Sequence, residues 1–392
     1  MAIKSLPRSV IMLGFVSMFM DISSEMIHSL LPVFMVSVLG VSALSVGIIE
    51  GIAEATASIT KIFSGVVSDW IGRRKPLVLF GYTMAALTKP LFPLAQGVTA
   101  ILTARFIDRV GKGIRGAPRD ALITDLVPKN LHGAAFGLRQ SMDTVGAFIG
   151  PTVAMALMFF TFNNYRLVFW LAVIPAFIAV ACIVFGVEEP EHTSTGKTRP
   201  FPIRKSELIK LPLSFWIVVA FAAAFTLARF SEAFLLLRAD NLGLAAWLTP
   251  AILITMNIVY AGSAYPIGNL SDRIGKFGLL TIGIILLIVA DLTLALGHNL
   301  YWTFIGTALW GLHMGMTQGL LSALVADVAP SELRGTAFGM FHLLTGITLL
   351  IASALAGWLW TAYGPAETFY FGAAFAGVAL IGFLQIRDKY LK

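Results

Sequence analysis

The stretch Gly65-Val-Val-Ser-Asp69-Trp-Ile-Gly72-Arg73 returns later in the chain as Gly268-Asn-Leu-Ser-Asp272-Arg-Ile-Gly275-Lys276. A second pair of matches begins at Asp125 and at Asp327, where Asp-x-x-Pro is followed by Gly-x-Ala-Phe-Gly. The shift along the chain is nearly the same for both pairs. Two separate matches with nearly one shift indicate that the second half of the chain repeats the first.

The chain around these copies is strongly apolar. Of its 392 residues, 57% are hydrophobic and only 12% are charged, and the mean hydropathy is +0.84. A soluble domain carries about 25% charged residues. This composition excludes a soluble globular protein and a disordered chain, and the single cysteine, Cys182, excludes a disulfide scaffold. A polytopic membrane protein remains.

Twelve apolar stretches are long enough to cross a membrane at about 20 residues each. We expect all of them to be helices, because a helix satisfies its own backbone hydrogen bonds in lipid. The predicted spans are 9–38, 43–69, 76–95, 98–125, 132–160, 165–187, 211–237, 244–270, 277–297, 301–326, 333–360 and 365–386. The fold class is therefore an all-α membrane protein.

The polar stretch 188–210 has the composition of a linker and lies between the sixth and seventh spans. It predicts an N-terminal six-helix bundle over 1–187 and a C-terminal six-helix bundle over 211–392. Because six is an even number, the two halves keep one orientation and form parallel repeats. We expect a solute site between them near the middle of the membrane.

Lysine and arginine are distributed unevenly along the chain, whose formal net charge is +7. Outside the spans they gather at the two termini, in the linker and on the connections of one side. The opposite connections hold only Arg166 and Arg238. This pattern predicts an inner (plasma) membrane protein with both termini cytoplasmic. It assigns the basic excess to membrane orientation, so we expect no nucleic-acid partner.

The run Gly65-x-x-x-Asp69-x-x-Gly72-Arg73-Arg74-Lys75 resembles motif A of the major facilitator superfamily, and its copy lies where that family has a second one. The resemblance covers the whole chain and implies twelve helices that alternate between inward-open and outward-open states. The segment 146–151 resembles a motif of members that export small molecules or drugs in exchange for protons. The segment 105–120 resembles a prokaryotic subfamily.

The motif loops contain candidates for a conformational latch. A carboxylate at a helix end can accept hydrogen bonds from the free N–H groups of a neighbouring helix. Arg73 or Arg74 can pair with acids at the end of the fourth span, and contacts made in one state only would hold that state. Alternatively, these charges only orient the chain in the membrane. The candidates are Gly65, Asp69, Gly72, Arg73, Arg74, Asp120, Asp125 and Asp272.

Charged side chains inside the first-half spans share helix faces, as the spacings of Asp21, Glu25 and His28 show. Each such charge costs about 2.5–3.5 kcal/mol at the bilayer centre, so these groups must face one another or a wet cavity. They could form ion pairs that hold helices together. They could also carry protons, which an approaching arginine would release. The proton-coupling candidates are Asp21 and Glu54, which we favour as carriers, with Glu25, Glu50 and Asp143 as substitutes. We expect Asp21, Glu54, Arg109 and Asp143 to lie at one level.

Candidates for binding the solute are the cationic residues of the first half together with polar and aromatic residues of the second. Arginine suits carboxylates and phosphates through its planar guanidinium. The alternative for the aromatic residues is ordinary helix packing. The candidates are His28, Arg105, Arg109, Lys112, Arg139, Arg229, Glu232, Asn257, Tyr260, Trp310 and His313.

The sequence thus predicts a secondary active transporter that moves a small organic solute by alternating access in proton-coupled export. The alternatives are a carrier of an anionic metabolite bound by intramembrane Arg and Lys, or of a divalent metal or its chelate bound by Asp21, Glu25, His28, Glu50 and Glu54. Neither His-Glu-x-x-His nor Gly-x-Ser-x-Gly occurs, and a phosphate loop ending at Thr198 would need glycine where Glu191 stands. We therefore expect no enzyme, no ATP-driven pump and no cofactor. The expected partners are the solute, protons and lipid, and the expected state is a monomer.

Overall fold

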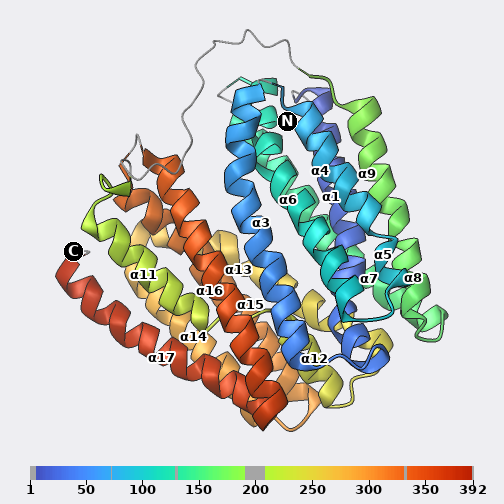
Figure 1. Ribbon diagram of the computed structural model, residues 1–392. Coiled ribbons are helices and arrows are strands. Elements are labelled where there is room, and N and C mark those ends of the chain that lie inside the picture. Colours follow the sequence, from blue (N-terminus) through green and yellow to red (C-terminus); the bar gives the residue numbers. More distant parts are fainter. Residues whose placement is uncertain (1–5, 72, 129–130, 190–207, 331–332, 391–392) are drawn as a thin grey trace. The chain divides into compact units, whose positions relative to one another are not determined.

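The computed structural model describes residues 6–71, 73–128, 131–189, 208–330 and 333–390, and it contains helices and no strand within these ranges. Figure 1 shows the long helices of the chain. The predicted all-α membrane fold is confirmed.

Each predicted span corresponds to a helix or to a helix with one interruption. The first-half elements are α1 (Arg8–His28), α2 (Leu31–Val33), η2 (Phe34–Val38), α3 (Ala43–Ile71), α4 (Lys75–Thr88), α5 (Leu91–Leu94), α6 (Val98–Leu126), α7 (His132–Phe160), α8 (Tyr165–Leu171) and α9 (Val173–Gly186). The second-half elements are α11 (Leu213–Leu227), α12 (Ala233–Asn241), η4 (Ala246–Leu248), α13 (Pro250–Ile274), α14 (Lys276–Leu296), α15 (Leu300–Val328), α16 (Arg334–Tyr363) and α17 (Pro365–Tyr390).

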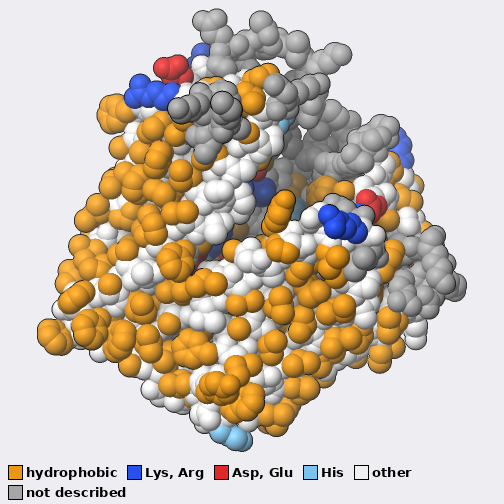
Figure 2. Space-filling view, turned by 180° about the vertical axis from the view of Figure 1, so that it is seen from behind, with side chains coloured by type: hydrophobic (Ala, Val, Ile, Leu, Met, Phe, Trp, Pro, Cys, Tyr) orange, Lys and Arg blue, Asp and Glu red, His pale blue; other side chains and the backbone are white. Residues whose placement is uncertain are grey.

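Most of the long helices are long enough and apolar enough to cross a bilayer. Within the described ranges, nine helical segments are long and apolar enough to cross a membrane, and Leu213–Leu227 is a shorter apolar helix. Large hydrophobic side chains such as Phe160 and Phe185 are exposed, and Figure 2 shows a face covered largely by hydrophobic side chains. In contrast, α6 is less apolar because it carries charges from Arg105 to Asp120.

The internal repeat is visible in the helix boundaries. Helix α6 begins at Val98 and ends at Leu126, and α15 begins at Leu300 and ends at Val328. Both boundaries are shifted by the same offset as the motif matches at Asp125 and Asp327. The starts of α7 and α16, at 132 and 334, are related by this offset as well. The repeat identified from the motifs therefore extends to whole helices.

The chain forms two compact units. The first consists of Met1–Phe34 and Thr56–Phe201, and the second of Met35–Ala55 and Pro202–Lys392. In the first unit, α1 packs against α7 and α9, and α4 packs against α6. In the second unit, α15 packs against α13 and α14, and α14 also packs against α17. The predicted linker falls mostly on residues 190–207, which lie outside the described ranges, so the proposed bundle boundaries stay a prediction.

The segment 35–55 joins the second unit through close helix contacts. A Cβ atom built on Gly51 would lie 2.8 Å from the Cα atom of Leu350 in α16. The Leu44 amide also donates to Thr361 Oγ1 at 3.2 Å. Backbones approach this closely only where one residue has no side chain, so glycine in α3 sets this contact.

Arg166 and Arg238, which the sequence analysis placed on connections, lie within α8 and α12, and each binds the C-terminal end of a helix. Arg166 Nη1 donates to the Pro93 carbonyl in α5 at 2.5 Å. Arg238 donates to the carbonyls of Leu294 (3.0 Å) and Gly297 (2.7 Å) at the end of α14. The last carbonyls of a helix lack hydrogen-bond donors within the helix, and both arginines supply such donors.

Candidate functional site

The acidic face of α1 lies directly against α7. A Cβ atom on Gly146 would lie 2.9 Å from the Cβ atom of Asp21, and one on Gly150 would lie 2.7 Å from that of Glu25. Each of the two acids therefore sits opposite a glycine, where α1 and α7 are close enough for backbone contact. This packing fixes the positions of both carboxyl groups along the axis of α7 within the first unit.

The same two acids interact electrostatically with the charged stripe of α6. Asp21 interacts with Lys112, Arg115 and Arg119, and also with the acid Asp143 of α7. Glu25 interacts with Lys112 and with the two arginines at the other end of the stripe, Arg109 and Arg105. The first unit thus places two carboxyl groups of α1 within range of several cations, and the side chain of Lys112 is exposed.

His28, the third residue of this face, contacts both buried arginines. Its Nε2 atom lies in contact with Arg105 Nη1 and with Arg109 Nη2. Arg105 and Arg109 are only 1% and 3% exposed. A neutral imidazole offers one acceptor nitrogen, so two guanidinium groups converge on one acceptor. Such a point attracts negative charge.

A buried ion pair that the sequence analysis did not single out lies beside this cluster. Lys89, at the end of α4, donates to Asp108 Oδ1 at 2.9 Å and to Ser24 Oγ at 3.1 Å. Asp108 Oδ2 also lies 3.8 Å from Arg109 Nε. Asp108 is therefore the counter-ion of Lys89 at the shorter distance and of Arg109 at the longer one. The sequence held the signal, because Lys89 is a single charge in the otherwise apolar span 76–95.

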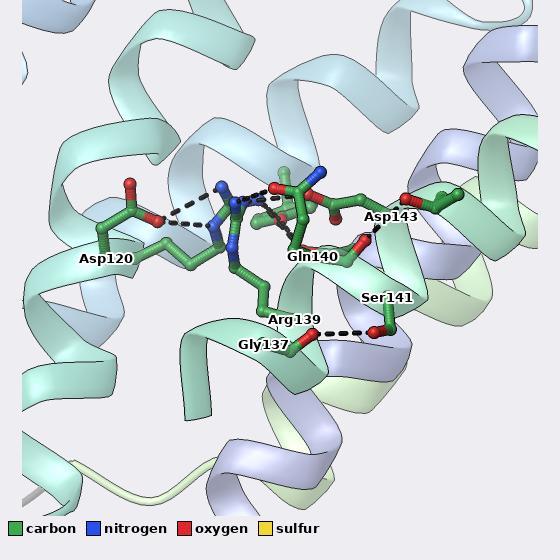
Figure 3. A network of polar contacts seen from close by, with 10 residues as sticks. Asp120, Gly137, Arg139, Gln140, Ser141 and Asp143 are labelled. Carbon is green, nitrogen blue, oxygen red and sulfur yellow. Dashed lines mark hydrogen bonds and ion pairs between the residues drawn. The ribbon is translucent and has the colours of Figure 1, made fainter. Parts of the chain in front are cut away.

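Helix α7 contributes its own ion pair. Arg139 Nη1 lies 2.9 Å from Asp143 Oδ2, one turn further along the helix, and Arg139 Nη2 donates to Gln140 Oε1 at 3.0 Å. Figure 3 shows these residues together with Asp120 of α6, which pairs with Arg119 at 3.3 Å. The second oxygen of Asp143, Oδ1, is buried and accepts no hydrogen bond from the described residues.

In the second unit, three of the candidate residues interact with one another. Arg229 interacts electrostatically with Glu232 and Tyr260, and the Tyr260 hydroxyl donates to Gln318 Oε1 at 3.3 Å. Asn257 is half-buried on the same helix as Tyr260. These residues supply a polar cluster with both signs of charge.

Trp310 and His313 lie in the buried part of the second unit, where His313 also interacts electrostatically with Arg229. Both are buried, their rings are 5.4 Å apart, and Trp310 also lies 5.3 Å from Phe230. They are part of the aromatic core in this structure, which agrees with the packing alternative for the aromatic candidates. A role in solute binding stays a prediction.

Two of the proton-coupling candidates belong to the other unit. Glu50 and Glu54 lie in the segment 35–55, which packs with the second unit, whereas Asp21, Arg109 and Asp143 belong to the first. Glu50 is buried and Glu54 is half-buried. The expected common level of Glu54 with the other three residues therefore stays a prediction.

The motif A region contains an ion pair that is repeated in both units. Arg74 Nε pairs with Asp125 Oδ2, and Lys276 Nζ pairs with Asp327 Oδ2. The two pairs are related by the same offset as the helix boundaries. Each unit therefore ties the start of its third span to the end of its fourth.

The structure describes only some of the remaining latch candidates. Arg73 is exposed, and a Cβ atom on Gly65 would lie 3.4 Å from the Ala117 Cβ atom. Gly72 and the side chains of Asp69 and Asp272 lie outside the described part of the chain.

The N-terminus of α4 binds the carboxylate of Glu189, and the expected contacts of Asp69 and Asp272 with helix N-termini stay predictions. The two carboxylate oxygens of Glu189 accept from the backbone N–H groups of Arg74 (2.6 Å) and Lys75 (2.8 Å). The first N–H groups of a helix have no partner within the helix. The sequence analysis assigned Glu189 to the linker, and nothing in its local sequence distinguishes a capping acid from a linker acid.

Among the side chains that the structure describes, no group of three or more His, Cys, Asp or Glu is arranged to hold a metal ion. The first-unit cluster is instead a mixed arrangement of acids and cations.

Comparison with known proteins places these features in a family. The sequence profile of the Major Facilitator Superfamily matches residues 13–341 and 239–391. An uncharacterized MFS-type transporter of Methanocaldococcus jannaschii is 33% identical over 379 residues, which are 95% of this chain and 93% of that protein. The quinolone resistance protein NorA of Staphylococcus aureus is 28% identical over 114 residues, or 29% of each chain. The crystal structure of the nucleoside transporter NupG aligns over 96% of this chain and 99% of its own, with 15% identity and a TM-score of 0.80.

Proposed function

Because the chain belongs to the Major Facilitator Superfamily, whose members move small solutes across membranes, we propose that it exports a small organic solute in exchange for protons. The observation that carries this proposal is the position of Asp21 and Glu25 on α1, opposite the cationic stripe of α6. Carboxyl groups and movable cations in one membrane bundle are what proton exchange requires.

The coupling step follows from the geometry of the first unit. A carboxyl group prefers to be ionised when a cation is close and protonated when the cation withdraws. Motion of α1 against α6 changes the distances from Asp21 to Lys112, Arg115 and Arg119. Alternating access would therefore load a proton in one state and release it in the other.

Asp21 is the preferred carrier and Glu25 the second. Asp21 is the acid that also interacts with Asp143, and two nearby carboxyl groups favour one shared proton. Asp143 itself is paired with Arg139, which makes it a modulator of Asp21. Glu50 and Glu54 remain proposed carriers from the second unit.

The organic nature of the solute rests on two observations. The second unit offers Arg229, Glu232 and Tyr260 as a cluster that can bind polar groups of either sign. A relative over part of the chain is named as a quinolone resistance protein. We therefore propose Arg229, Glu232, Asn257 and Tyr260 as solute contacts.

The test is solute-driven proton movement in proteoliposomes. A screen for solutes that raise the thermal stability of the purified protein, run at acidic and at alkaline pH, would select the solute, with a quinolone included as a probe. The Asp21→Asn variant should bind this solute while proton exchange falls at least tenfold. Asp240→Asn is the matched control, because Asp240 accepts a hydrogen bond from Ser37 at the surface of the second unit. Full proton-coupled flux in both Asp21→Asn and Glu25→Gln would refute the assignment.

An anionic solute is the second candidate, and one observation favours it. His28, Arg105 and Arg109 converge from α1 and α6 on one point. Two buried guanidinium groups at one acceptor are suited to a carboxylate or a phosphate. Competition of flux by simple carboxylates, abolished in Arg109→Gln, would support this reading. Unchanged flux in the presence of excess carboxylates and phosphates would exclude it.

We further propose that the protein is a monomer with both termini in the cytoplasm and that motif A acts as a latch. Orientation can be tested in a Cys182→Ser background. A cysteine at Lys4 should then react with a membrane-impermeant thiol reagent only from the cytoplasmic side. A cysteine at Phe162, which is 92% exposed between α7 and α8, should react only from the other side.

A further inference from the structure

Helix α14 contains a buried acid that the proposed function does not use. Asp291 is the only acidic residue of the segment Lys276–Leu296, and it is 0% exposed. Neither of its carboxyl oxygens has a hydrogen-bond partner among the described residues. At a rise of about 1.5 Å per residue it lies roughly 8 Å from the end of α14, well inside an apolar span.

The carboxyl group of Asp291 is pressed against α17. A Cβ atom on Gly372 would lie 2.5 Å from Asp291 Oδ2 and 3.0 Å from the Phe230 ring. The Phe230 ring in turn packs against Trp310 at 5.3 Å and against Phe369 at 5.6 Å. The carboxyl group thus lies against Gly372 of α17, and the Phe230 ring borders the same point.

The internal repeat shows what is missing around Asp291. The offset that relates α6 to α15 also relates Lys89 to Asp291, and Lys89 is buried as well. Lys89 has a counter-ion in Asp108, but the equivalent of Asp108 is Trp310. The two halves therefore hold a buried ionisable residue at the same position, and among the described residues only Lys89 of this pair has an ion-pair partner.

Most charged groups on the surrounding elements are engaged elsewhere, but both ring nitrogens of the buried His313 also have no hydrogen-bond partner among the described residues. Within the described residues, none forms a hydrogen bond or ion pair with Asp291. Lys276 pairs with Asp327, Arg229 interacts with Glu232, and Arg238 donates to carbonyls at the end of α14. The others on packed elements are Tyr260, Tyr265 and Arg273 of α13, Tyr301 and His313 of α15, and Glu367 and Tyr370 of α17.

A proton is the ligand that fits these surroundings. An isolated carboxylate in an apolar interior is strongly unfavourable, and such groups are neutralised instead. A hard metal cation needs several oxygen ligands around it, and among the described side chains no group of three or more His, Cys, Asp or Glu is arranged to hold a metal ion. We propose that Asp291 binds an exchangeable proton and is a second proton site, located in the second unit and distinct from the acids of α1.

Exchange requires the contact between α14 and α17 to loosen. Asp291 is fully buried and its Oδ2 atom lies against Gly372 of α17, so a separation of α14 from α17 would admit water to it. Its proton would then be taken up or released in step with that movement. The site itself does not depend on the proposed export function; only its use in coupling does.

The direct test is infrared difference spectroscopy of the purified protein in lipid, titrated from acidic to alkaline pH without solute. The wild type should show the C=O stretch of a protonated carboxyl, and this band should disappear reversibly at alkaline pH. The Asp291→Asn variant should lose the part of this absorption that Asp291 contributes, while any contribution from Asp21 and Glu25 stays, whereas Asp327→Asn, which removes an acid paired with Lys276, should keep the full wild-type band. An Asp291→Asn spectrum that matches that of the wild type would overturn the proposal. A band that is absent from the wild type, or present but unchanged by pH, would overturn the proposal.

A second variant covers the case in which Asp291→Asn does not fold. Gly372→Ala retains Asp291 but places a methyl group against its Oδ2 atom, so the band should shift in frequency. An unshifted band in a folded Gly372→Ala protein would mean that it comes from another acid. Because these readouts need no solute, their failure is distinct from a failure of proton-coupled export.

Discussion

The ion pair between Lys89 and Asp108 gives a quantitative prediction. Its atoms lie 2.9 Å apart, and the two side chains are only 2% and 6% exposed. At an effective dielectric constant of about 20, two unit charges at this distance attract by roughly 6 kcal/mol. Much of this offsets the cost of removing both charges from water. Removing one partner is expected to cost about 3–5 kcal/mol, since the other charge stays buried.

The contacts around the pair predict which variant suffers more. In Lys89→Met, Asp108 keeps Arg109 at 3.8 Å as a second cation. In Asp108→Asn, the ammonium of Lys89 keeps only the neutral Ser24 hydroxyl and the new amide. We therefore expect Lys89→Met near the lower end of the range and Asp108→Asn near the upper end.

The assay is a double-mutant cycle on the free energy of unfolding, measured in detergent micelles. The combined variant Lys89→Met with Asp108→Asn should lose at least about 2 kcal/mol less than the sum of the single losses. Asp120→Asn is the control, because its pair with Arg119 is partly exposed and should be worth less than about 1 kcal/mol. Additive losses in the double variant would refute the view that the pair is coupled.

Three further predictions concern other contacts. Gly146→Val should destabilise the first unit by about 1–3 kcal/mol, because its Cβ would lie 2.6 Å from the Met18 carbonyl oxygen. Thermal unfolding measures this effect, and an unchanged midpoint temperature of unfolding would contradict it. Arg238→Gln should cost about 2 kcal/mol, since charged hydrogen bonds to the end of α14 are lost; faster amide exchange there is the measurement. Lys276→Ala should slow transport. The free energy of unfolding should fall by less than about 1 kcal/mol, because the ion pair between Lys276 and Asp327 is partly exposed. A transport rate equal to that of the wild type would contradict a latch.

The fold could be predicted from the sequence because its main determinants are local. Apolar runs of about 20 residues mark the spans, and the two motif copies mark the repeat. The interruptions were predictable only in part. The chain leaves helical geometry between His28 and Leu31, just before Pro32, which cannot donate to the carbonyl four residues earlier. It also leaves helical geometry between Leu227 and Ala233, and no proline or glycine within this gap announces the break.

The candidate site was predictable where residues share one helix. The spacing of Asp21, Glu25 and His28 places them on one face, and the structure sets that face against α7 and α6. Partners from different helices could not be derived, because spacing along one helix carries no information about its neighbours. Asp291 could have been identified from the sequence, because it is a single acid in an apolar span. The search for helix faces with several charges does not find it, because it shares its face with no other charge.

The membership of residues 35–55 in the second unit bears on experiments that divide the gene. Severing the chain in its linker would produce a C-terminal fragment without this segment. That fragment would expose the surface of α16 on which Gly51 rests, including the backbone at Leu350. Complementation from two plasmids should therefore succeed only when the N-terminal piece donates its second helix to the other, and a fragment starting near residue 208 should be degraded when produced alone.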